Sequence, residues 1–246
     1  MRLEDVHGVI LAGGLGSRLR RVLPDAPKPM APVEGRPFVE WVARWLAASG
    51  VRSATVATGY LGEVIARHFA SRPVAGIAID CVREERALGT AGGFLNAARG
   101  SRRMPAGWLV LNGDSLSLAD IGAFVEHLQR CGAEAAIVAC RVADVRRYGR
   151  LDVGPDGRLR RFAEKSASDE GPGLINAGVY LIPPALLDRF PEGEPLSFEH
   201  DVFPAWLRAG VSIAVNVSDG PFLDIGTDAS LALADEFIRN SRGRFS

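Results

Sequence analysis

The 246-residue sequence lacks the features that direct a protein to nucleic acid or to a membrane. Its 29 basic and 29 acidic residues balance, so no overall charge favours nucleic acid or an anionic membrane surface as a partner. No apolar run is long enough to cross a bilayer, and the N-terminal residues lack the basic start and apolar core of a signal peptide. We therefore expect a cytoplasmic protein that binds neither nucleic acid nor membranes and that holds any anion at a local site.

Cysteine is also scarce. The three cysteines are an odd number without CxxC spacing, which argues against a disulfide framework and against a zinc site. The four histidines lie in unrelated contexts and have no metal-ligand spacing. The sequence contains no evident internal repeat and no proline-rich or serine-rich linker. These absences predict a single domain over residues 1–246.

The first 141 residues alternate between apolar runs and helix-length segments. Strands are predicted over residues 8–13, 53–59, 76–82, 107–113 and 133–141. Residues 37–50 begin with proline, end with glycine and carry an apolar stripe, which is typical of an amphipathic helix. Another helix is expected within 117–132, with Ser117 as its N-cap. This alternation favours a doubly wound, mostly parallel, Rossmann-like α/β sheet with helices on both faces.

The pattern changes after residue 141. Two alternating segments around "PDG" at 155–157 predict a β-hairpin, and "GLINAGVYLI" at 173–182 predicts a further strand. Two helices, two short strands and a final helix over 228–240 are expected after it. We interpret the second half as a subregion added over the sheet of the first half.

Ligands of a doubly wound sheet bind outside the carboxyl ends of its strands, so the residues after each strand are the first candidates for a site. After the first predicted strand, "AGGLGSR" at 12–18 holds three glycines and Arg18. Glycines let backbone N–H groups approach a phosphate, and a guanidinium binds two phosphate oxygens at once. The spacing is not that of a Walker loop, nor of GxGxxG, because Leu19 stands where the third glycine would be. This argues against a Rossmann-type oxidoreductase, and on the glycines alone a plain turn is an equal alternative.

Three charged residues follow other predicted elements. Lys28 stands between two prolines that restrict its loop, which suits an ammonium that neutralises a charged leaving group. Asp114 and Asp224 each end an apolar run, and Mg²⁺ prefers one or two carboxylates together with substrate phosphate oxygens. The alternatives are a solvated lysine, a surface turn at Asp114 and a helix cap at Asp224.

Polar residues of the second half suit a phosphorylated sugar. Glu164 and Asn176 offer the acceptors and donors that sugar hydroxyls require, and Lys165 suits a sugar phosphate. Asn176 places an amide inside an otherwise apolar strand, where an unpaired polar group is costly, so we expect it to have a hydrogen-bond partner.

In order along the chain, "LAGGLGSRL", "PKPMAPV", "LGTAGG", "LNGDS", "EK", "INAGVY" and "FLDIGT" resemble the sugar-1-phosphate nucleotidylyltransferases over nearly the whole sequence. The likeness is strongest to D-glycero-α-D-manno-heptose 1-phosphate guanylyltransferases, with mannose-1-phosphate guanylyltransferases and N-acetylmuramate-1-phosphate uridylyltransferases as close relatives. It implies a nucleotide-diphospho-sugar transferase (GT-A-like) fold. Residues 1–141 would bind mainly the nucleotide, and residues 142–246, with the hairpin, mainly the sugar phosphate.

The resemblance also implies a reaction. A phosphate oxygen of the sugar 1-phosphate attacks the α-phosphorus of GTP in line, which gives a GDP-sugar and pyrophosphate for surface-polysaccharide synthesis, with Mg²⁺ as cofactor. The implied catalytic residues are Arg18, Lys28, Asp114 and Lys165, and the implied metal ligands are Asp114 and Asp224. The implied nucleotide-binding residues are Leu11, Ala12, Gly13, Gly14, Gly16, Ser17, Arg18, Glu84, Gly89, Thr90, Asn112 and Gly113. The implied sugar-phosphate-binding residues are Gly149, Glu164, Lys165, Asn176, Ala177 and Gly178.

One residue position indicates which nucleotide base the protein binds. In the family, the residue five before the glycine of "LGTA" reads the base edge, and here that residue is Glu84. Guanine offers two adjacent donors, N1–H and the N2 amino group, which one carboxylate accepts together, so Glu84 favours GTP. Glu85 is the neighbouring alternative, because the segment reads "ERALGTA" instead of "EPLGTA", and an acid also occurs here in uridylyltransferases.

Other readings stay open on the sequence alone. The nearest alternative substrate pairs are mannose 1-phosphate with GTP, and a muramate or hexose phosphate with UTP or dTTP. A non-catalytic, nucleotide-sugar-binding regulatory subunit is an alternative of another class, which the presence of both metal carboxylates disfavours. The oligomeric state is open, with a homodimer as one option, because Trp41 and Trp45 fit either a core or an interface.

Overall fold

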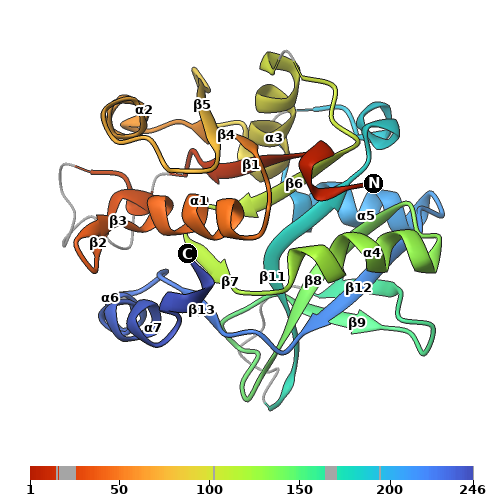
Figure 1. Cartoon of the computed structure of the whole chain (residues 1–246). Helices are drawn as coiled ribbons and strands as arrows, with labels where there is room; N and C mark the ends of the chain where they lie inside the picture. Colours follow the sequence, from red (N-terminus) through yellow and green to blue (C-terminus); the bar gives the residue numbers. More distant parts are fainter. Residues whose placement is uncertain (15, 17–25, 102, 164–170, 194, 246) are drawn as a thin grey trace.

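The computed structural model of the chain describes residues 1–14, 16, 26–101, 103–163, 171–193 and 195–245 (Figure 1). Its main sheet has nine strands: β1 (Val6–Ala12), β4 (Ser53–Thr58), β5 (Ala78–Arg83), β6 (Gly107–Asn112), β8 (Ala135–Val142), β9 (Arg150–Val153), β10 (Leu159–Ala163), β11 (Gly173–Ile182) and β12 (Ile213–Ser218). Two short two-stranded sheets stand beside it: β2 (Pro32–Val33) with β3 (Arg36–Pro37), and β7 (Ser115–Ser117) with β13 (Phe222–Asp224).

The sheet is mixed but mostly parallel, which confirms the predicted class. Strands β5, β4, β1 and β6 run parallel to one another, and β12 runs parallel to β8. Strand β11 lies between β6 and β8 and is antiparallel to both. Between β8 and β11 the chain forms the β9–β10 hairpin, and the described residues of this connection contain no crossover helix of the kind that parallel neighbours require.

Helices cover both faces of the sheet and form two separate hydrophobic layers. One layer contains α1 (Phe38–Ala48), α2 (Gly62–Ser71), α4 (Ile121–Cys131) and α7 (Ala234–Asn240). The other contains α3 (Gly89–Gly100), α5 (Phe203–Arg208) and the π-helical turn η5 (Phe198–Val202). Ile10 faces the first layer and Val9 the second, and both have 0% exposure. A strand buried on both faces needs a continuous apolar run, which is the pattern that "GVILAG" has.

The remaining elements are short: η1 (Leu3–Asp5), η3 (Lys28–Met30), η4 (Pro184–Arg189), α6 (Asp228–Ala232) and η6 (Arg242–Arg244). The helix predicted over 228–240 is divided into α6 and α7. Thr227 caps α6 through a reciprocal capping box with Ser230, so Asp224 is not its cap. No helix in the described part of the chain is long and apolar enough to cross a bilayer.

Ser117 is not the N-cap of α4, so that prediction is wrong. Helix α4 begins at Ile121, and Oδ1 of Asp120 accepts the backbone N–H of Ala123 at 2.9 Å. Ser117 is a buried residue of β7, where it pairs with Phe222. Its partner lies more than a hundred residues downstream, so local sequence patterns do not reveal this pairing.

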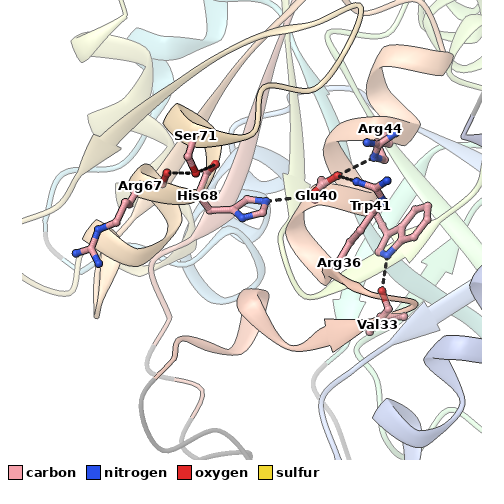
Figure 2. Close-up of polar contacts among 8 residues, drawn as sticks. All are labelled: Val33, Arg36, Glu40, Trp41, Arg44, Arg67, His68 and Ser71. Atoms are coloured by element: carbon pink, nitrogen blue, oxygen red, sulfur yellow. Dashed lines mark hydrogen bonds and ion pairs between the residues drawn. The ribbon is translucent and has the colours of Figure 1, made fainter.

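A buried carboxylate joins α1 to α2. Glu40 is 2% exposed and accepts hydrogen bonds from Arg36 Nη1 at 2.6 Å, Arg44 Nε at 2.8 Å and His68 Nε2 at 2.9 Å (Figure 2). Burial alone would raise the pKa of Glu40, but the three hydrogen bonds outweigh it and hold the pKa below its ordinary value. The charge of Glu40 is thus retained in the interior because three donors surround it.

Both tryptophans of α1 pack within the chain. Trp45 is 3% exposed in the core, whereas Trp41 contacts the ring of Phe245 at 5.1 Å between centroids. The indole N–H of Trp41 donates to the carbonyl of Val33 at 2.9 Å (Figure 2). These contacts account for both indoles without a second copy of the chain.

The buried histidine of β1 makes stability depend on pH. His7 is 1% exposed, with Nδ1 2.8 Å from Ser53 Oγ and Nε2 2.9 Å from Thr55 Oγ1. Burial is the main cause that lowers the pKa of His7 to about 4, and the charge of Arg103 adds to it. Between pH 6.5 and 4 the unfolded chain therefore binds a proton here that the folded protein does not.

We predict that the free energy of unfolding falls as pH decreases through this window. The wild type should lose about 1–3 kcal/mol more than His7→Asn between pH 6.5 and 4.5, because Asn has no titrating group. Urea unfolding at a series of pH values measures the difference. If the free energy of unfolding depended on pH in the same way in the wild type and in His7→Asn, the lowered pKa of His7 would be contradicted.

Candidate active site

A cavity of about 850 Å³ lies at the carboxyl ends of β1 and β6, where the sequence places its candidate residues. Among the described candidates, all but Gly113 line it: Leu11, Ala12, Gly13, Gly14, Gly16, Lys28, Glu84, Gly89, Thr90, Asn112, Asp114, Gly149, Asn176, Ala177, Gly178 and Asp224. Ser17, Arg18, Glu164 and Lys165 lie outside the described residues. The fold thus gathers residues from both halves of the chain around one space.

Gly113 is implied by the resemblance as a nucleotide-binding residue, but its own atoms do not line the cavity. It is buried beneath the cavity, where its N–H donates to the carbonyl of Leu11 at 2.8 Å. A Cβ there would lie 2.7 Å from that same oxygen. Gly113 therefore lets β6 turn tightly against the end of β1, and it presents Asp114 to the cavity instead of lining the cavity itself.

A lysine and two carboxylates meet on one wall of the cavity. Nζ of Lys28 lies 2.6 Å from Oδ2 of Asp114 and 3.8 Å from Oδ1 of Asp224. The two carboxylates are adjacent because β7 and β13 pair, which sets Asp224 opposite Ser115 and lets Ile225 N–H donate to the Asp114 carbonyl at 3.0 Å. The side chain of Lys28 is only 13% exposed, so this ammonium is held largely away from bulk water.

The glycine loop packs directly on the lysine. Gly16 has φ +55°, a conformation that L side chains rarely adopt, and a Cβ at Gly16 would lie 2.7 Å from Cβ of Lys28. The two segments that the sequence presents one after the other, "AGGLGSR" and "PKP", are therefore in contact. Glycine is required here both for backbone conformation and for space.

Glu84 reaches the cavity between glycines. A Cβ at Gly13 would lie 2.3 Å from Oε1 of Glu84, and a Cβ at Gly59 would lie 2.5 Å from the same atom. Burial raises the pKa of Glu84, while a hydrogen bond from the backbone of Leu88 partly opposes that shift. Glu85 is exposed and does not line the cavity, so of the two neighbouring acids Glu84 is the one in position.

Asn176 has the partners that its place in an apolar strand requires, as predicted. Its Oδ1 accepts the N–H of Gly178 at 2.9 Å, and its Nδ2 donates to the hydroxyl of Tyr180 at 2.8 Å. The register of β11 against β8 shifts between Asn176 and Tyr180, and Gly178 has φ +71°. This irregularity turns the amide toward the cavity, a common use of a bulge beside a site.

Glu199 is a cavity residue that the sequence reasoning missed. Its Oε2 accepts from Ser197 Oγ at 2.9 Å, and its Oε1 lies 3.3 Å from the hydroxyl of the fully buried Tyr180 and 3.4 Å from Asn176 Nδ2. It lies on the π-helical turn η5, directly before the helix α5. Rare π-helical turns often occur at functional sites, but no periodicity in a short segment announces one.

The segment before Glu199 is attached to the "LGTA" motif. Gly89 has φ +76°, and a Cβ there would lie 2.3 Å from the carbonyl oxygen of Leu196. That carbonyl accepts the N–H of Ala91 at 2.9 Å, and Thr90 Oγ1 accepts the N–H of Phe198 at 3.0 Å. The start of α3 and the segment that leads into η5 are therefore in direct contact, and both contribute residues to the cavity lining.

Aromatic side chains complete the far side of the cavity. Tyr148 and Phe222 meet edge to face with centroids 5.8 Å apart, and both line the cavity together with Phe162. A Cβ at Gly149 would lie 2.6 Å from the ring of Phe162, so this glycine makes room for the ring. Aromatic side chains of this kind are typical of the lining of a ligand pocket.

The described residues supply few ligands for a metal. No group of three or more His, Cys, Asp or Glu side chains within this part of the chain is arranged to hold an ion. Two carboxylates, Asp114 and Asp224, are adjacent at the cavity. This donor set fits Mg²⁺ that shares its coordination with substrate phosphates, and it does not fit a self-contained protein site.

Comparison with known proteins gives one family. The model described as "Nucleotidyl transferase" matches residues 7–241. Mannose-1-phosphate guanylyltransferase of Mycobacterium tuberculosis is 34% identical over 242 residues, which cover 98% of this chain and 65% of that protein. D-glycero-alpha-D-manno-heptose 1-phosphate guanylyltransferase of Aneurinibacillus thermoaerophilus is 33% identical over 221 residues, which cover 90% of this chain and 93% of that protein.

A solved structure has the same fold. HddC from Yersinia pseudotuberculosis, crystallised in complex with GMP-PN, superposes with a TM-score of 0.82 at 30% sequence identity. The match covers 94% of this chain and 99% of that chain. The mixed sheet and its covering helices are therefore shared over almost the full length of both molecules.

Proposed function

This chain belongs to the nucleotidyl transferase family, whose members here are sugar-phosphate nucleotidyltransferases, and from that premise we propose that it transfers a guanylyl group from GTP to a sugar 1-phosphate. The products are a GDP-sugar and pyrophosphate. The sugar phosphate we favour is D-glycero-α-D-manno-heptose 1-phosphate, and the pathway we expect is surface-polysaccharide synthesis in the cytoplasm. The choice of guanine rests on one observation, the carboxylate of Glu84 in the cavity.

Glu84 supports guanine because of its hydrogen-bonding chemistry. An ionised carboxylate has acceptors only, and guanine presents two adjacent donors. Uracil and thymine present an acceptor on each side of a single donor, which a carboxylate meets with repulsion. The glycines around Glu84 leave its oxygens close to the phosphate loop, where the base of a bound nucleotide would lie within reach.

The assembled charges support catalysis over a purely regulatory role. Bringing two polyanions together requires cations at the reacting phosphorus, and Lys28 is already fixed between two carboxylates in the protein. Asp114 and Asp224 would hold Mg²⁺, which when bound would neutralise phosphate charge and orient the triphosphate. Lys28 would place its ammonium near the α-phosphate, and the glycine loop with Arg18 would bind the remaining phosphates.

The sugar would occupy the half of the cavity near β11. Asn176, Glu199 and the backbone of Gly178 face this space and supply both donors and acceptors. Glu164 and Lys165 would complete the pocket by resemblance to the family. Mannose 1-phosphate is the second candidate, since the mannose and heptose relatives are 34% and 33% identical to this chain.

Turnover separates the candidate substrates. We predict pyrophosphate release with GTP and the heptose phosphate that exceeds the rate with mannose 1-phosphate at least about tenfold in kcat/KM, or about 1.4 kcal/mol of discrimination. The measurement pairs GTP, UTP, dTTP and ATP with heptose, mannose, glucose and N-acetylmuramate 1-phosphates. Equal efficiency with mannose 1-phosphate removes the heptose assignment, and the absence of turnover with every pair removes the enzymatic proposal.

The base assignment is tested by Glu84→Gln. The amide replaces one acceptor with a donor that faces a guanine donor, so kcat/KM for GTP should fall about 10–100-fold, corresponding to about 1–3 kcal/mol. The wild type should prefer GTP over ITP, which lacks the N2 amino group, and the variant should lose that preference. Because burial raises the pKa of Glu84, KM for GTP should also increase as pH falls into the weakly acidic range and the carboxylate is protonated.

Glu85→Gln is the matched control, because it makes the same chemical change one residue away at an exposed position. It should leave the ratio of GTP to ITP turnover unchanged. A loss of base preference in Glu85→Gln with none in Glu84→Gln would transfer the assignment to the neighbouring acid.

Metal binding is tested without turnover. In the protein alone, the Lys28 ammonium offsets one of the two negative charges of the carboxylates that would hold the ion and repels a metal cation, so Mn²⁺ should bind weakly in the absence of nucleotide. Lys28→Met keeps the stem and removes the charge, and it should tighten Mn²⁺ binding at least about tenfold by electron paramagnetic resonance, or about 1.4 kcal/mol. Lys28→Arg should stay near the wild type, and adding Asp114→Asn to Lys28→Met should abolish the gain. Unchanged Mn²⁺ affinity in Lys28→Met would contradict the shared site.

A further inference from the structure

The hairpin after Lys28 contains an unusual residue at its tip. Strands β2 and β3 are joined by Glu34 and Gly35, with φ of +46° and +74°. Positive φ at both turn residues is the geometry of tight hairpins, but non-glycine residues there are usually Asn or Asp. Glutamate at such a position indicates that its side chain is needed where the turn places it.

Glu34 is bound by three groups of the C-terminal segment. Its backbone N–H donates to Oδ1 of Asp235 at 2.7 Å. Its carboxylate accepts from Arg239 Nη1 at 2.7 Å and from Arg242 Nη2 at 3.0 Å, and the side chain is 17% exposed. Figure 1 shows this hairpin beside α6 and α7, although about two hundred residues separate them in the sequence.

The opposite side of the hairpin is fixed to the core. Arg36 donates to the buried Glu40, and Val33 accepts the indole N–H of Trp41 (Figure 2). The carbonyl of the fully buried Ala31 accepts the N–H of Phe38 at 2.9 Å. The segment from Lys28 to the hairpin tip therefore has two anchors, one on α1 and one on the C-terminal segment.

The C-terminal anchor also leads back to the site. Asp224 ends β13, the buried Ile225 follows, and Thr227 caps α6, which continues into α7. Lys28 and Asp224, whose charged atoms lie 3.8 Å apart, thus belong to two separate chain segments. The contacts of Glu34 connect these two segments at a second place, the tip of the hairpin.

We propose that Glu34 is a positioning residue, which holds the Lys28 loop in register with Asp224 by clamping the 32–37 hairpin to the C-terminal segment. The proposal rests on the proposed function, because it assigns Lys28 a role in the transfer. Reactions of this kind are sensitive to placement, and a displacement of about 1 Å at a reacting group can reduce the rate about a hundredfold. Two anchors restrict the ammonium more tightly than the flanking prolines alone.

Glu34→Gln tests the clamp because it removes the charge and preserves the size of the side chain. The expected result is a decrease of about tenfold in kcat, with KM values for GTP and the sugar phosphate within about twofold of wild type. Glu34→Asp keeps the charge and tolerates positive φ, and it should recover part of kcat. A Glu34→Gln variant with the kcat of the wild type would overturn the proposal.

Glu134→Gln is the matched control for loss of an ion pair. Glu134 also accepts from an arginine, Arg189 at 2.6 Å, and from a backbone N–H, that of Ser212 at 3.0 Å, but it does not line the cavity. Both variants should change the melting temperature similarly, because partly exposed ion pairs contribute little to stability. If both reduce kcat equally, Glu34 acts only through general stability and the positioning role is wrong.

A second readout does not depend on turnover. Lys28 and Lys165 are the only lysines in the sequence, so ¹⁵N-lysine labelling gives two side-chain ammonium signals, and Lys28→Met assigns them. In nucleotide-free protein, Glu34→Gln should shift or broaden the Lys28 signal, while Glu134→Gln should not. An unchanged Lys28 signal overturns the clamp, whereas a changed signal with no turnover in the wild type would contradict the proposed function and leave the clamp in place.

Discussion

The interaction on which the rest of the site depends is the contact of one ammonium with two carboxylates. Lys28, Asp114 and Asp224 come from three distant parts of the chain and meet within 2.6–3.8 Å. A single cation between two anions leaves one net negative charge, which fits a site that receives further cationic charge together with a phosphorylated substrate. The glycine loop, the β7–β13 pair and the hairpin at 32–37 all contribute to keeping these three groups in place.

Around that contact, glycines admit charged side chains that bulkier residues would exclude. Gly13 and Gly59 leave space for the carboxylate of Glu84, and Gly178 approaches Asn112 so closely that a Cβ would lie 2.5 Å from its amide nitrogen. A cluster of glycines after a strand is often interpreted only as a phosphate-binding loop. In this protein several of them instead decide where neighbouring polar groups lie, and thereby which atoms of a ligand can be recognised.

Two glutamates outside the cavity, the buried Glu40 and the partly buried Glu34, each have several hydrogen-bond donors as partners. Glu40 has three donors, and Glu34 has two guanidinium partners and one backbone contact. Glu34 lies at the tip of the 32–37 hairpin and contacts the C-terminal segment, whereas Glu40 lies on α1 and accepts from Arg36 of the same hairpin. The arrangement connects the packing of α1, α2 and α7 to the geometry of the loop that carries Lys28.

The class of fold and most of the cavity lining could be predicted from the order of the residues alone. Continuous apolar strands alternating with amphipathic helices indicate a doubly wound sheet, and such a sheet gathers the residues at its strand ends, as Gly14 and Asp114 show. Those inferences succeed because they depend on local periodicity and on one topological rule.

Which side chains are in contact could not be predicted in this way and depends on how the chain packs. The pairing of β7 with β13 placed Ser117 in a strand instead of at a helix start, and set Asp114 beside Asp224. The π-helical turn brought Glu199 to Asn176, and Gly113 proved to be a packing residue beneath the cavity. Such contacts join segments tens to hundreds of residues apart. The energy of each contact depends on the distance between side chains that are far apart in the sequence. Local sequence patterns do not contain these distances, so the contacts can be identified only in the packed chain.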